Sequence, residues 1–534
     1  MAALACAIEL TVKYGSTYRP VVEPVREIEE IWALEDAREE SGEPLVTRLF
    51  CNGVPMAYDA ENNVFYGSLG LENGAQWPEI KLTASEEAAK GLSLCFADDY
   101  GFDDCDMAIR EGYSYQIFAY TDTAYSYAEV VFTGLPLVNV TADQTIERED
   151  VPAQIEIALA AEGLQTNGRI HKRGGASILN DKVGYKLEFT RTTDGKKKIY
   201  REIPGMGTDS QVILLPMNAL DTTMMRDRLS WALYARLTRR DEPFSARKTQ
   251  YCELFLNGEY RGVYLMFEPF SVRQEVAKAG EERLTTDSVY RTAVISLSHG
   301  RPCMEDPYSA ATGFELYYPM DGEPDFSPLA DYFALLGETD DAAFMRRAAQ
   351  IIDLDSALRY DVVLQLFGLT DNVINNMYTW AQNSRGHTRY RFDFWDLDVS
   401  WGLKRDEIGE MHENWVFFPL VDRLLRADEE GGVRKRYGEI YREVREKAFD
   451  AETVEALVGQ YAHELNDSGA MARNAERWET ENYAADGYEL VAFAAERIAL
   501  LDEPVRAISA GEEIDLRFLE KTNYDDKGTP LTEE

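Results

Sequence analysis

The sequence predicts an α+β protein in which a small all-β, sandwich-like domain precedes a mixed segment that becomes mainly helical. Two observations lead to this fold class. Between residues 45 and 135, short runs of alternating apolar and polar residues are separated by Asn, Gly, Asp and Pro, which is typical of antiparallel strands joined by turns. Beyond residue 402, apolar residues instead recur at three- and four-residue intervals, as along amphipathic helices.

The composition is that of a large, very acidic globular protein. Hydrophobic residues make up 45% of the 534 residues, which is enough to bury a large core. The chain has 55 basic and 95 acidic residues, a formal net charge of −40. Such a field repels nucleic-acid phosphates and anionic membranes, and it attracts basic polypeptides. No apolar run approaches the roughly 20 residues that span a bilayer. We therefore expect no nucleic-acid partner and no membrane span, and the oligomeric state stays unknown.

The cysteines and the N-terminus say little about location. The six cysteines include no CxxC pair, and the five histidines form no zinc-binding spacing, so isolated thiols are expected. The start MAALACAIEL contains Ala5-Cys6-Ala7, which fits a signal-peptide cleavage site. It lacks a basic segment before a short apolar stub, so a truncated signal peptide and a first strand both stay open.

The N-terminal part is predicted as two segments. Residues 1–44 hold a helix over 22–41, and residues 45–135 form the β-rich accessory domain. This domain carries five closely spaced tyrosines, and two interpretations apply to them. They stack on a ligand such as a glycan, or they form core and cross-strand pairs, which alternating aromatics in strands favour. The tyrosines are Tyr113, Tyr115, Tyr120, Tyr125 and Tyr127.

The third domain, predicted over 136–505, begins with strands and then contains the most basic stretch of the chain, 169–202. Within that stretch, Arg173 and Ser177 flank paired glycines, which let backbone N–H groups approach an anion closely. Lys182 follows, and Lys186 lies on a strand facing away from its apolar neighbours. This combination indicates a phosphate-binding region.

A helix and a hairpin come next. Asp221 is expected to cap the helix DTTMMRDRLSWALYARL. On it, Arg226 and Asp227 either form a surface pair or provide one side chain to the site. The hairpin TQYCELFL–EYRGVYLMFEP turns at Asn257-Gly258, a pair that favours a type I′ turn. Glu268 ends its second strand, where a nucleotide-binding hinge is expected.

A second hairpin follows the helix DSALRYDVVLQLFGLT, which Asp355 or Ser356 is expected to cap. That helix delivers Asp371 at its end. The strands MYTWA and RYRFDFW are joined by a turn through 383–386, and the second strand is expected to end on two further carboxylates, Asp396 and Asp398.

These residues suit phosphoryl transfer. The reaction needs a carboxylate that accepts the hydroxyl proton and oxygen ligands that hold Mg²⁺ against the phosphates. Asp371, then Asn376 five residues later, then a hairpin and then Asp396, is the order that protein kinases use. The alternative is that all three are ordinary turn and strand-end residues of an acidic protein. On this stretch alone, both interpretations stay open.

Several motifs resemble those of the CotH spore-coat protein kinase family. RGGASILNDKVGYKLEF resembles its R-G-N-S-S…K-K-S-Y-K-I-K-F signature, and MNALDTTMMRDRLSWAL resembles its D…R-N-R-L segment. CELFLNGEYRGVYLMFE is similar to V-x-L-F-L-N-G-x-Y-x-G-V-Y-L-x-x-E, the most specific match. LFGLTDNVINNMYTW and FDFWDLDVSWG are similar to G-N-x-D…N-N and P-W-D-L-D-x-S-x-G. The motifs occur in order over about residues 136–430.

The resemblance implies an atypical, secretory-type protein kinase fold that transfers the ATP γ-phosphoryl group to Ser or Thr of a protein, with Mg²⁺ or Mn²⁺. It makes Asp371 the catalytic proton acceptor and gives the metal to Asn376 and Asp396. Asp398 either shares the metal or caps the turn. The nucleotide phosphates fall to Lys182 or Lys186, with Arg173 and Ser177 in the phosphate loop and Glu268 at the hinge.

The resemblance also implies a bacterial protein that is secreted, on the cell surface or in the spore coat, with a cytoplasmic location still open. The acidic charge suggests a basic, Ser-rich protein substrate. Four positions depart from the family motifs, namely Ala176, Val183, Leu369 and Phe394. Two alternatives therefore remain: a non-catalytic coat or adhesion protein, and a kinase for a non-protein acceptor. Residues 506–534 are expected to form an acidic tail.

Overall fold

The structure is a computed structural model. It describes residues 22–26, 28–69, 75–76, 82–84, 91–97, 108–109, 111–174, 176–192, 195–217, 221–292, 313–321, 323–403, 415–416, 418–480 and 486–512. The expected signal-peptide-like start, Gly175 of the phosphate loop and the tail beyond residue 512 lie outside the described residues. The chain divides into two compact units. Unit 1 contains Met1–Thr222, Thr249–Pro269 and Tyr461–Ala485, and unit 2 contains Thr223–Lys248, Phe270–Gln460 and Asp486–Glu534.

The N-terminal part of unit 1 is built on a mixed sheet, in the order β1-β9-β11-β12-β6-β5, with β2 also paired to β12. The pairs β1–β9, β12–β6 and β12–β2 are parallel, so the expectation of an antiparallel sheet was wrong. Residue alternation indicates which face of a strand is buried but not the direction of its partner. The strands are β1 (Val22–Arg26), β2 (Glu39–Glu40), β5 (Ala57–Asp59), β6 (Val64–Ser68), β9 (Ser93–Ala97), β11 (Ser114–Tyr120) and β12 (Ala124–Thr133).

A second small sheet shares a core with this one. It consists of β3 (Leu49–Cys51), β4 (Val54–Pro55) and β8 (Leu82–Ala84), and a two-stranded sheet pairs β7 (Ala75–Gln76) with β10 (Ala108–Ile109). The shared core includes Leu49, Leu82, Phe96, Ile117 and Val130. The expected N-terminal helix is the shorter α2 (Ile28–Asp36), because the residues before it form β1. Its Ile31 packs with Cys95 and Phe118.

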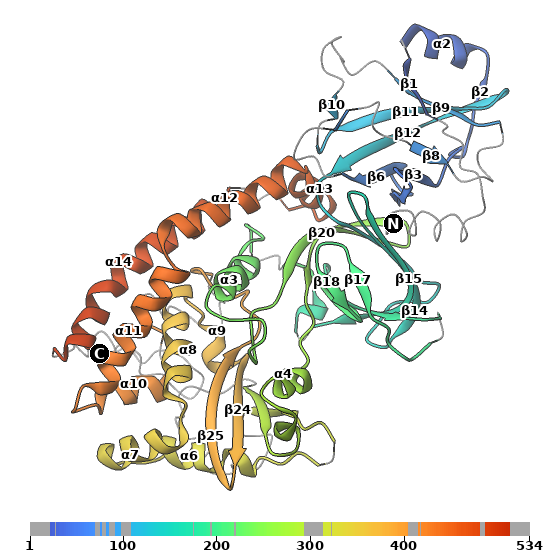
Figure 1. Cartoon of the computed structure of the whole chain (residues 1–534). Coiled ribbons are helices and arrows are strands. Elements are labelled where there is room, and N and C mark those ends of the chain that lie inside the picture. Colours follow the sequence, from blue (N-terminus) through green and yellow to red (C-terminus); the bar gives the residue numbers. More distant parts are fainter. Residues whose placement is uncertain are drawn as a thin grey trace. The chain divides into compact units, whose positions relative to one another are not determined.

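The next part of unit 1 is a closed barrel in the order β13-β14-β15-β16-β19-β21-β20 (Figure 1). Its interior is filled by apolar side chains, among them Ile155, Ile170, Leu187, Val212 and Leu254. The strands are β13 (Leu137–Thr141), β14 (Val151–Leu159), β15 (Glu162–Arg173), β16 (Gly184–Thr190), β19 (Gln211–Leu215), β20 (Thr249–Leu256) and β21 (Glu259–Phe267), with a hairpin of β17 (Arg201–Ile203) and β18 (Gly207–Asp209) and a 3-10 turn η3 (Ala176–Leu179).

A helix from late in the chain completes unit 1. Helix α13 (Ala470–Arg477) packs on β21, and its Arg473 binds both oxygens of Glu253, which is fully buried in β20, at 2.8 and 2.9 Å. The Tyr260 hydroxyl donates to the same carboxylate at 2.7 Å. Tyr66 of the N-terminal sheet stacks on Tyr260. The N-terminal sheet, the barrel and α13 therefore share one buried polar cluster.

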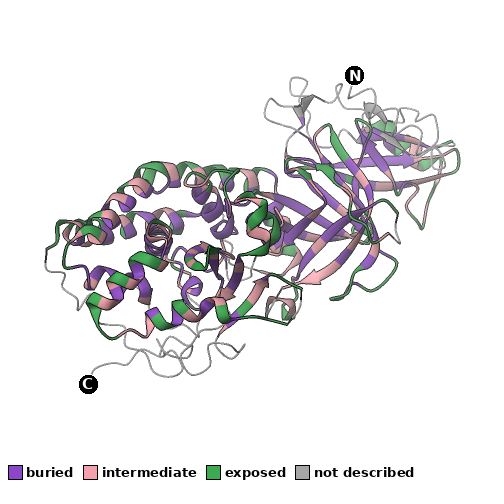
Figure 2. Ribbon diagram, turned by 60° about the horizontal axis from the view of Figure 1, so that its bottom comes forward, coloured by how far each residue is buried: buried purple, intermediate pink, exposed green. Residues whose placement is uncertain are grey.

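Unit 2 combines a four-stranded sheet, in the order β23-β22-β24-β25, with many helices. Figure 2 shows outer helices that are exposed along one side and buried along the other, as expected of amphipathic helices. The strands are β22 (Ser288–Thr292), β23 (Phe314–Tyr318), β24 (Met377–Ser384) and β25 (His387–Phe394). The helices are α3 (Arg226–Ala235), α4 (Val272–Lys278), α6 (Ala330–Leu336), α7 (Asp341–Ile351), α8 (Leu354–Phe367), α9 (Asp371–Ile374), α10 (Pro419–Arg426), α11 (Gly432–Lys447), α12 (Ala451–Asp467, which continues into unit 1) and α14 (Tyr488–Ala510), with 3-10 turns η4 (Glu281–Thr285) and η6 (Ser327–Leu329).

Mixed α and β structure is thus confirmed, and the part after residue 402 is mainly helical as predicted. Two expected helix caps were wrong. Helix α3 begins at Arg226, so Asp221 does not cap it. Helix α8 is capped by Asp353, whose side chain accepts from Ser356 N, and not by Asp355 or Ser356. None of the described helices combines the length and apolarity needed to cross a membrane.

Candidate active site

Asp371 lies at a sharp change of chain direction in unit 2. Helix α8 is followed by its C-cap, Gly368. The φ of Gly368 is 66°, a left-handed conformation that glycine adopts without steric cost. The short helix α9 then begins at Asp371, which is only 2% exposed. Five residues further along the chain, Asn376 Nδ2 donates to Asp371 Oδ2 at 2.9 Å. The five-residue spacing seen in the sequence therefore corresponds to a direct, buried hydrogen bond.

The β24–β25 hairpin (Figure 1) pairs Met377 with Phe394 at its base, so that Asp396 follows two residues after the paired end of β25. Its turn is the two residues Arg385-Gly386, both with positive φ, within the predicted 383–386. The second strand ends at Phe394, not at Asp396 or Asp398 as expected, because the backbone changes conformation at Asp396. Trp395 N donates to Asn376 O at 3.0 Å, which closes the base of the hairpin.

Two of the predicted metal-binding residues have an unusual backbone. Asn376 and Asp396 have φ of 58° and 59°, in the left-handed region. This conformation costs a non-glycine residue about 1–2 kcal/mol, somewhat less for Asn and Asp. Strained positions of this kind persist where the surroundings enforce them, and they are concentrated at functional sites. Twelve described non-glycine residues share a positive φ, hairpin-turn residues such as Asn257 and Arg385 among them, so this backbone is compatible with both the catalytic interpretation and ordinary turns.

The segment after Asp396 is held against two helices of unit 2. Leu397 is fully buried, and its carbonyl accepts from Ser400 Oγ at 2.7 Å. Ser400 N donates to the Asp398 carbonyl at 3.1 Å, so the turn is closed by backbone. Trp401 N donates to the last residue of α8, Phe367 O, at 2.8 Å. These bonds fix the backbone of Asp398.

Arg226 and Asp227 of α3 do not form a surface pair. Each is only 5% exposed. Arg226 Nε donates to the Ser400 carbonyl at 3.2 Å, and its guanidinium forms an ion pair with Glu489. Arg226 therefore supports the segment that follows Asp396 and Asp398. It contacts this segment through the Ser400 backbone and does not form a surface pair with Asp227.

The oxygen donors of this region suit Mg²⁺ or Mn²⁺. No cluster of three His, Cys, Asp or Glu side chains that would hold a resident metal occurs among the described residues. Mg²⁺ at phosphoryl-transfer sites is bound by one or two carboxylates together with substrate phosphates, so no such cluster is required. The carboxylate of Asp396 and the amide oxygen of Asn376 are hard oxygen ligands. Both residues have a left-handed backbone, and the hydrogen bond from Trp395 N to Asn376 O holds their segments together at the hairpin base.

In unit 1, the two candidate lysines differ in surroundings. Lys182 Nζ donates to Val263 O at 2.5 Å and to Asn474 Oδ1 at 2.8 Å, and it lies 4.9 Å from the centre of the Tyr264 ring. Burial lowers the pKa of Lys182 well below its usual value. Its ammonium group is bound by neutral groups, and the residue as a whole is half-buried.

Lys186 instead belongs to a charged cluster on the outer face of the barrel. Its Nζ lies 2.9 Å from Glu188, and the same carboxylate meets Lys198 at 2.6 Å and Arg169 at 2.7 Å. Burial acts to raise the pKa of Glu188, but the hydrogen bonds from Lys198 and Lys186 outweigh it and lower that pKa to about 2. Three cations thus surround one carboxylate, and Lys186 is 27% exposed.

The predicted phosphate loop lies between β15 and β16. Strand β15 ends at Arg173, and Gly174 follows with φ of 126°. A Cβ on Gly174 would lie 2.4 Å from Ser177 Oγ, so glycine is required for this close approach. Ser177 itself lies in the turn η3. Glu268 comes directly after β21, and the chain passes into unit 2 after the next residue.

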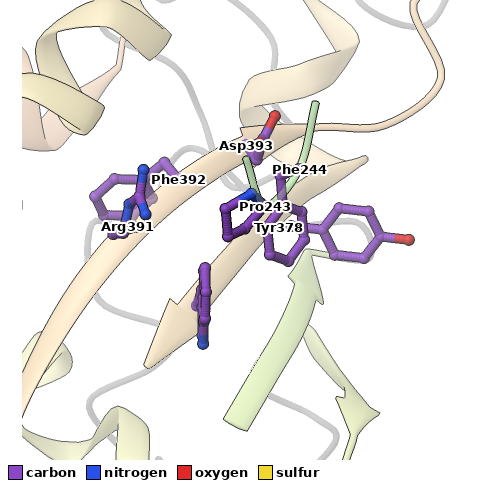
Figure 3. A pocket seen from close by; sticks show the side chains of 7 residues that line it. Pro243, Phe244, Tyr378, Arg391, Phe392 and Asp393 are labelled. Carbon is purple, nitrogen blue, oxygen red and sulfur yellow. The ribbon is translucent and has the colours of Figure 1, made fainter. Parts of the chain in front are cut away.

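No pattern in the sequence indicated the pocket of Figure 3. This small pocket lies beside the hairpin and is lined by Pro243, Phe244, Tyr378, Trp380, Arg391, Phe392 and Asp393. Burial raises the pKa of Asp393 to about 7, although Phe394 N and Tyr234 Oη donate to its carboxylate. No predicted site residue lines the pocket. Alternation along β25 marked Asp393 as a strand residue and nothing more.

The tyrosines of the N-terminal sheet pack against one another. Tyr115 is in the core, while Tyr120, Tyr125 and Tyr127 pack around Phe118. The Tyr127 hydroxyl donates to Glu35 of α2. These contacts are those of core and cross-strand pairs for the four tyrosines, whereas Tyr113, which precedes β11, is 57% exposed.

The arrangement in unit 2 is of the kind used by phosphotransferases: a buried acid, an amide bound to it and a further acid after a hairpin. The chain matches the family model described as CotH kinase protein over residues 170–501. Because this match covers more than half of the 534 residues, the protein belongs to the CotH kinase family, and membership implies a kinase-like function. No curated protein matches the chain.

Proposed function

We propose that the protein transfers the γ-phosphoryl group of ATP to Ser or Thr of basic, Ser-rich proteins, with Mg²⁺ or Mn²⁺. The observation that carries this proposal is the buried hydrogen bond between Asp371 and Asn376, joined through backbone to the left-handed Asp396. Membership of the CotH kinase family supports the reaction class. A kinase-like fold over residues 136–505, with residues 45–135 as an accessory domain, is part of the proposal.

In this mechanism, Asp371 accepts the proton of the attacking hydroxyl. The amide of Asn376 fixes the orientation of the Asp371 carboxylate through the 2.9 Å bond. Asn376 and Asp396 hold the metal, and Asp398 either shares it or only shapes the turn. When bound, the metal neutralises the charge that develops on the phosphates.

Lys186 is the better candidate for the phosphates. An ammonium that binds phosphate must be charged and accessible. Both lysines are half-buried, but Lys186 pairs with a carboxylate, whereas Lys182 donates to a carbonyl and an amide, and burial lowers its pKa well below the usual value. Arg173 and Ser177 then contribute the phosphate loop, in which Gly174 has the positive φ that glycine adopts readily. Glu268 is proposed at the nucleotide hinge.

The substrate class follows from charge. A net charge of −40 steers cationic polypeptides toward the protein and disfavours acidic ones. We propose a secreted, cell-surface or spore-coat location in a bacterium, in keeping with the family, with the cytoplasm as the alternative.

The decisive experiment measures transfer of labelled phosphate from ATP to a basic Ser-rich protein, with and without Mn²⁺. Asp371→Asn keeps the shape of the side chain but removes the proton acceptor, and a loss of at least about a hundredfold is expected. Asp321→Asn, the same change at an exposed position of unit 2, is the matched control and should retain full activity.

Equal incorporation by the wild type and Asp371→Asn would overturn the proposal. Labelling of small alcohols, but of no protein, would point to a non-protein acceptor. Nucleotide binding without any transfer would favour the coat or adhesion alternative.

A further inference from the structure

Asn372, the residue after Asp371, connects the two segments that carry the predicted metal-binding residues. It is fully buried. Its Nδ2 donates to the Trp395 carbonyl at 2.7 Å and to the Asn376 carbonyl at 3.4 Å. A side-chain amide has two N–H groups on its nitrogen, and here they reach two backbone carbonyls from either side of the hairpin.

The oxygen of this amide, Asn372 Oδ1, defines the orientation of the side chain. Asn372 Oδ1 is buried and accepts no hydrogen bond within the described part of the chain. Exchanging Oδ1 and Nδ2 would place oxygen against two carbonyl oxygens, so the contacts themselves define the orientation. A buried, unsatisfied acceptor costs free energy. The side chain of Asn372 therefore acts here through its two donor contacts.

The two carbonyls adjoin the strained residues. The Trp395 carbonyl belongs to the peptide group that leads into Asp396, so its direction helps to set φ of Asp396. The Asn376 carbonyl belongs to the peptide group that follows Asn376, and its direction sets ψ there. Both residues are left-handed, with φ of 59° and 58°. Asn372 is itself held from α8, because the Tyr360 hydroxyl donates to its carbonyl at 2.7 Å.

We propose that Asn372 is a positioning residue that fixes Asn376 and Asp396 in their metal-binding geometry before metal and nucleotide arrive. This inference rests on the proposed function. It adds a residue that touches none of the reacting groups but determines the affinity for the metal, because a preorganised site loses less conformational freedom on binding.

The test compares three variants of the full chain. Asn372→Asp keeps the shape but presents oxygen to both carbonyls, and Asn372→Ala removes the amide without adding charge. Asn375→Asp is the matched control, because its half-buried side chain forms no hydrogen bond among the described residues. Added charge alone would strengthen cation binding. A weaker affinity in Asn372→Asp therefore reports the lost donors.

The measurement is Mn²⁺ binding, followed by electron paramagnetic resonance with a non-hydrolysable ATP analogue present, on protein whose folded state is verified by circular dichroism. Both Asn372 variants should raise the Kd for Mn²⁺ at least tenfold, and excess Mn²⁺ should restore part of the transfer rate. Asn375→Asp should bind no more weakly than the wild type.

An unchanged Kd in the folded fraction of both Asn372 variants would overturn the inference, whatever their thermal stability. The outcome differs if the proposed function is wrong. In that case the wild type itself binds no Mn²⁺ with the nucleotide analogue, or Asp371→Asn transfers phosphate as well as the wild type does.

Discussion

Lys182 and Lys186 are four residues apart, but their ammonium groups have different partners. The interior contacts of Lys182 link the start of β16 to β21 and to Asn474 of α13. The partner of Lys186 is a carboxylate already shared with two other cations. Proximity in sequence therefore gives no guide to their roles, and substitution separates them.

We expect Lys186→Met to weaken binding of a fluorescent ATP analogue at least tenfold with little change in Tm. Lys182→Met should instead lower the free energy of unfolding by about 1–3 kcal/mol, because a buried carbonyl loses its donor. Equilibrium denaturation and nucleotide titration of both variants provide the check. The reverse pattern would assign the phosphates to Lys182.

At this scale the sequence indicated candidate residues but not their contacts. The spacing of Asp371 and Asn376 followed the order of protein kinases, and the structure adds a hydrogen bond between the two side chains that the spacing did not predict. Asn372 was not predicted, because a side-chain bond to distant carbonyls leaves no pattern in the chain. The left-handed backbone of Asp396 could not be predicted from the sequence either, since Asp is common both in turns and at strand ends.

At the scale of elements, local turn chemistry was the most reliable signal. Asn257-Gly258 predicted a type I′ hairpin, and both residues have positive φ. Helix starts were harder to predict, because Asp353, Asp355 and Ser356 are all good caps within four residues, and the choice depends on where α8 packs.

The β24–β25 turn offers a stabilising substitution. Arg385 has φ of 53° and is exposed, a conformation that asparagine adopts more easily. Arg385→Asn should raise the free energy of unfolding by roughly 0.3–1 kcal/mol without changing activity. Urea denaturation measures this change. Arg385→Val, which disfavours positive φ, should be destabilised, and equal stability of both variants would contradict the prediction.

At the scale of the whole molecule, one buried acid couples stability to pH. Asp361 of α8 is fully enclosed, and burial raises its pKa to about 7, against the hydrogen bonds from Tyr437 and Gln365. In the unfolded chain the pKa is about 3.9. Between these values the folded state binds more protons than the unfolded state. The contribution of Asp361 to stability is therefore complete below pH 4 and is lost as pH rises to about 7.

Asp361→Asn should remove this dependence. Between pH 4 and 7 the free energy of unfolding of the wild type should fall relative to that of the variant, by at most about 1.4 kcal/mol per pH unit. Urea denaturation at several pH values measures the difference, with the exposed Asp321→Asn as the control. Parallel curves for the wild type and Asp361→Asn would show that Asp361 titrates normally.

The overall class, mixed α and β with a helical C-terminal part, could be predicted because periodicity is local. The parallel strand pairs and the two compact units could not, since both depend on segments far apart in sequence. Nothing near β21 indicates that α13 packs on it, because the two elements are connected only through the fold.

The ion pair between Arg473 and Glu253 has a consequence for how the protein is made. The two residues are 220 positions apart. A ribosome adding about 5–20 residues per second needs roughly 10–45 s to cover that interval. Until then, closing the barrel would bury Glu253 without its cation, at a cost of several kcal/mol. The barrel is therefore expected to reach its final structure only after α13 has been synthesised, and a nascent chain halted before α13 should remain sensitive to protease in β20.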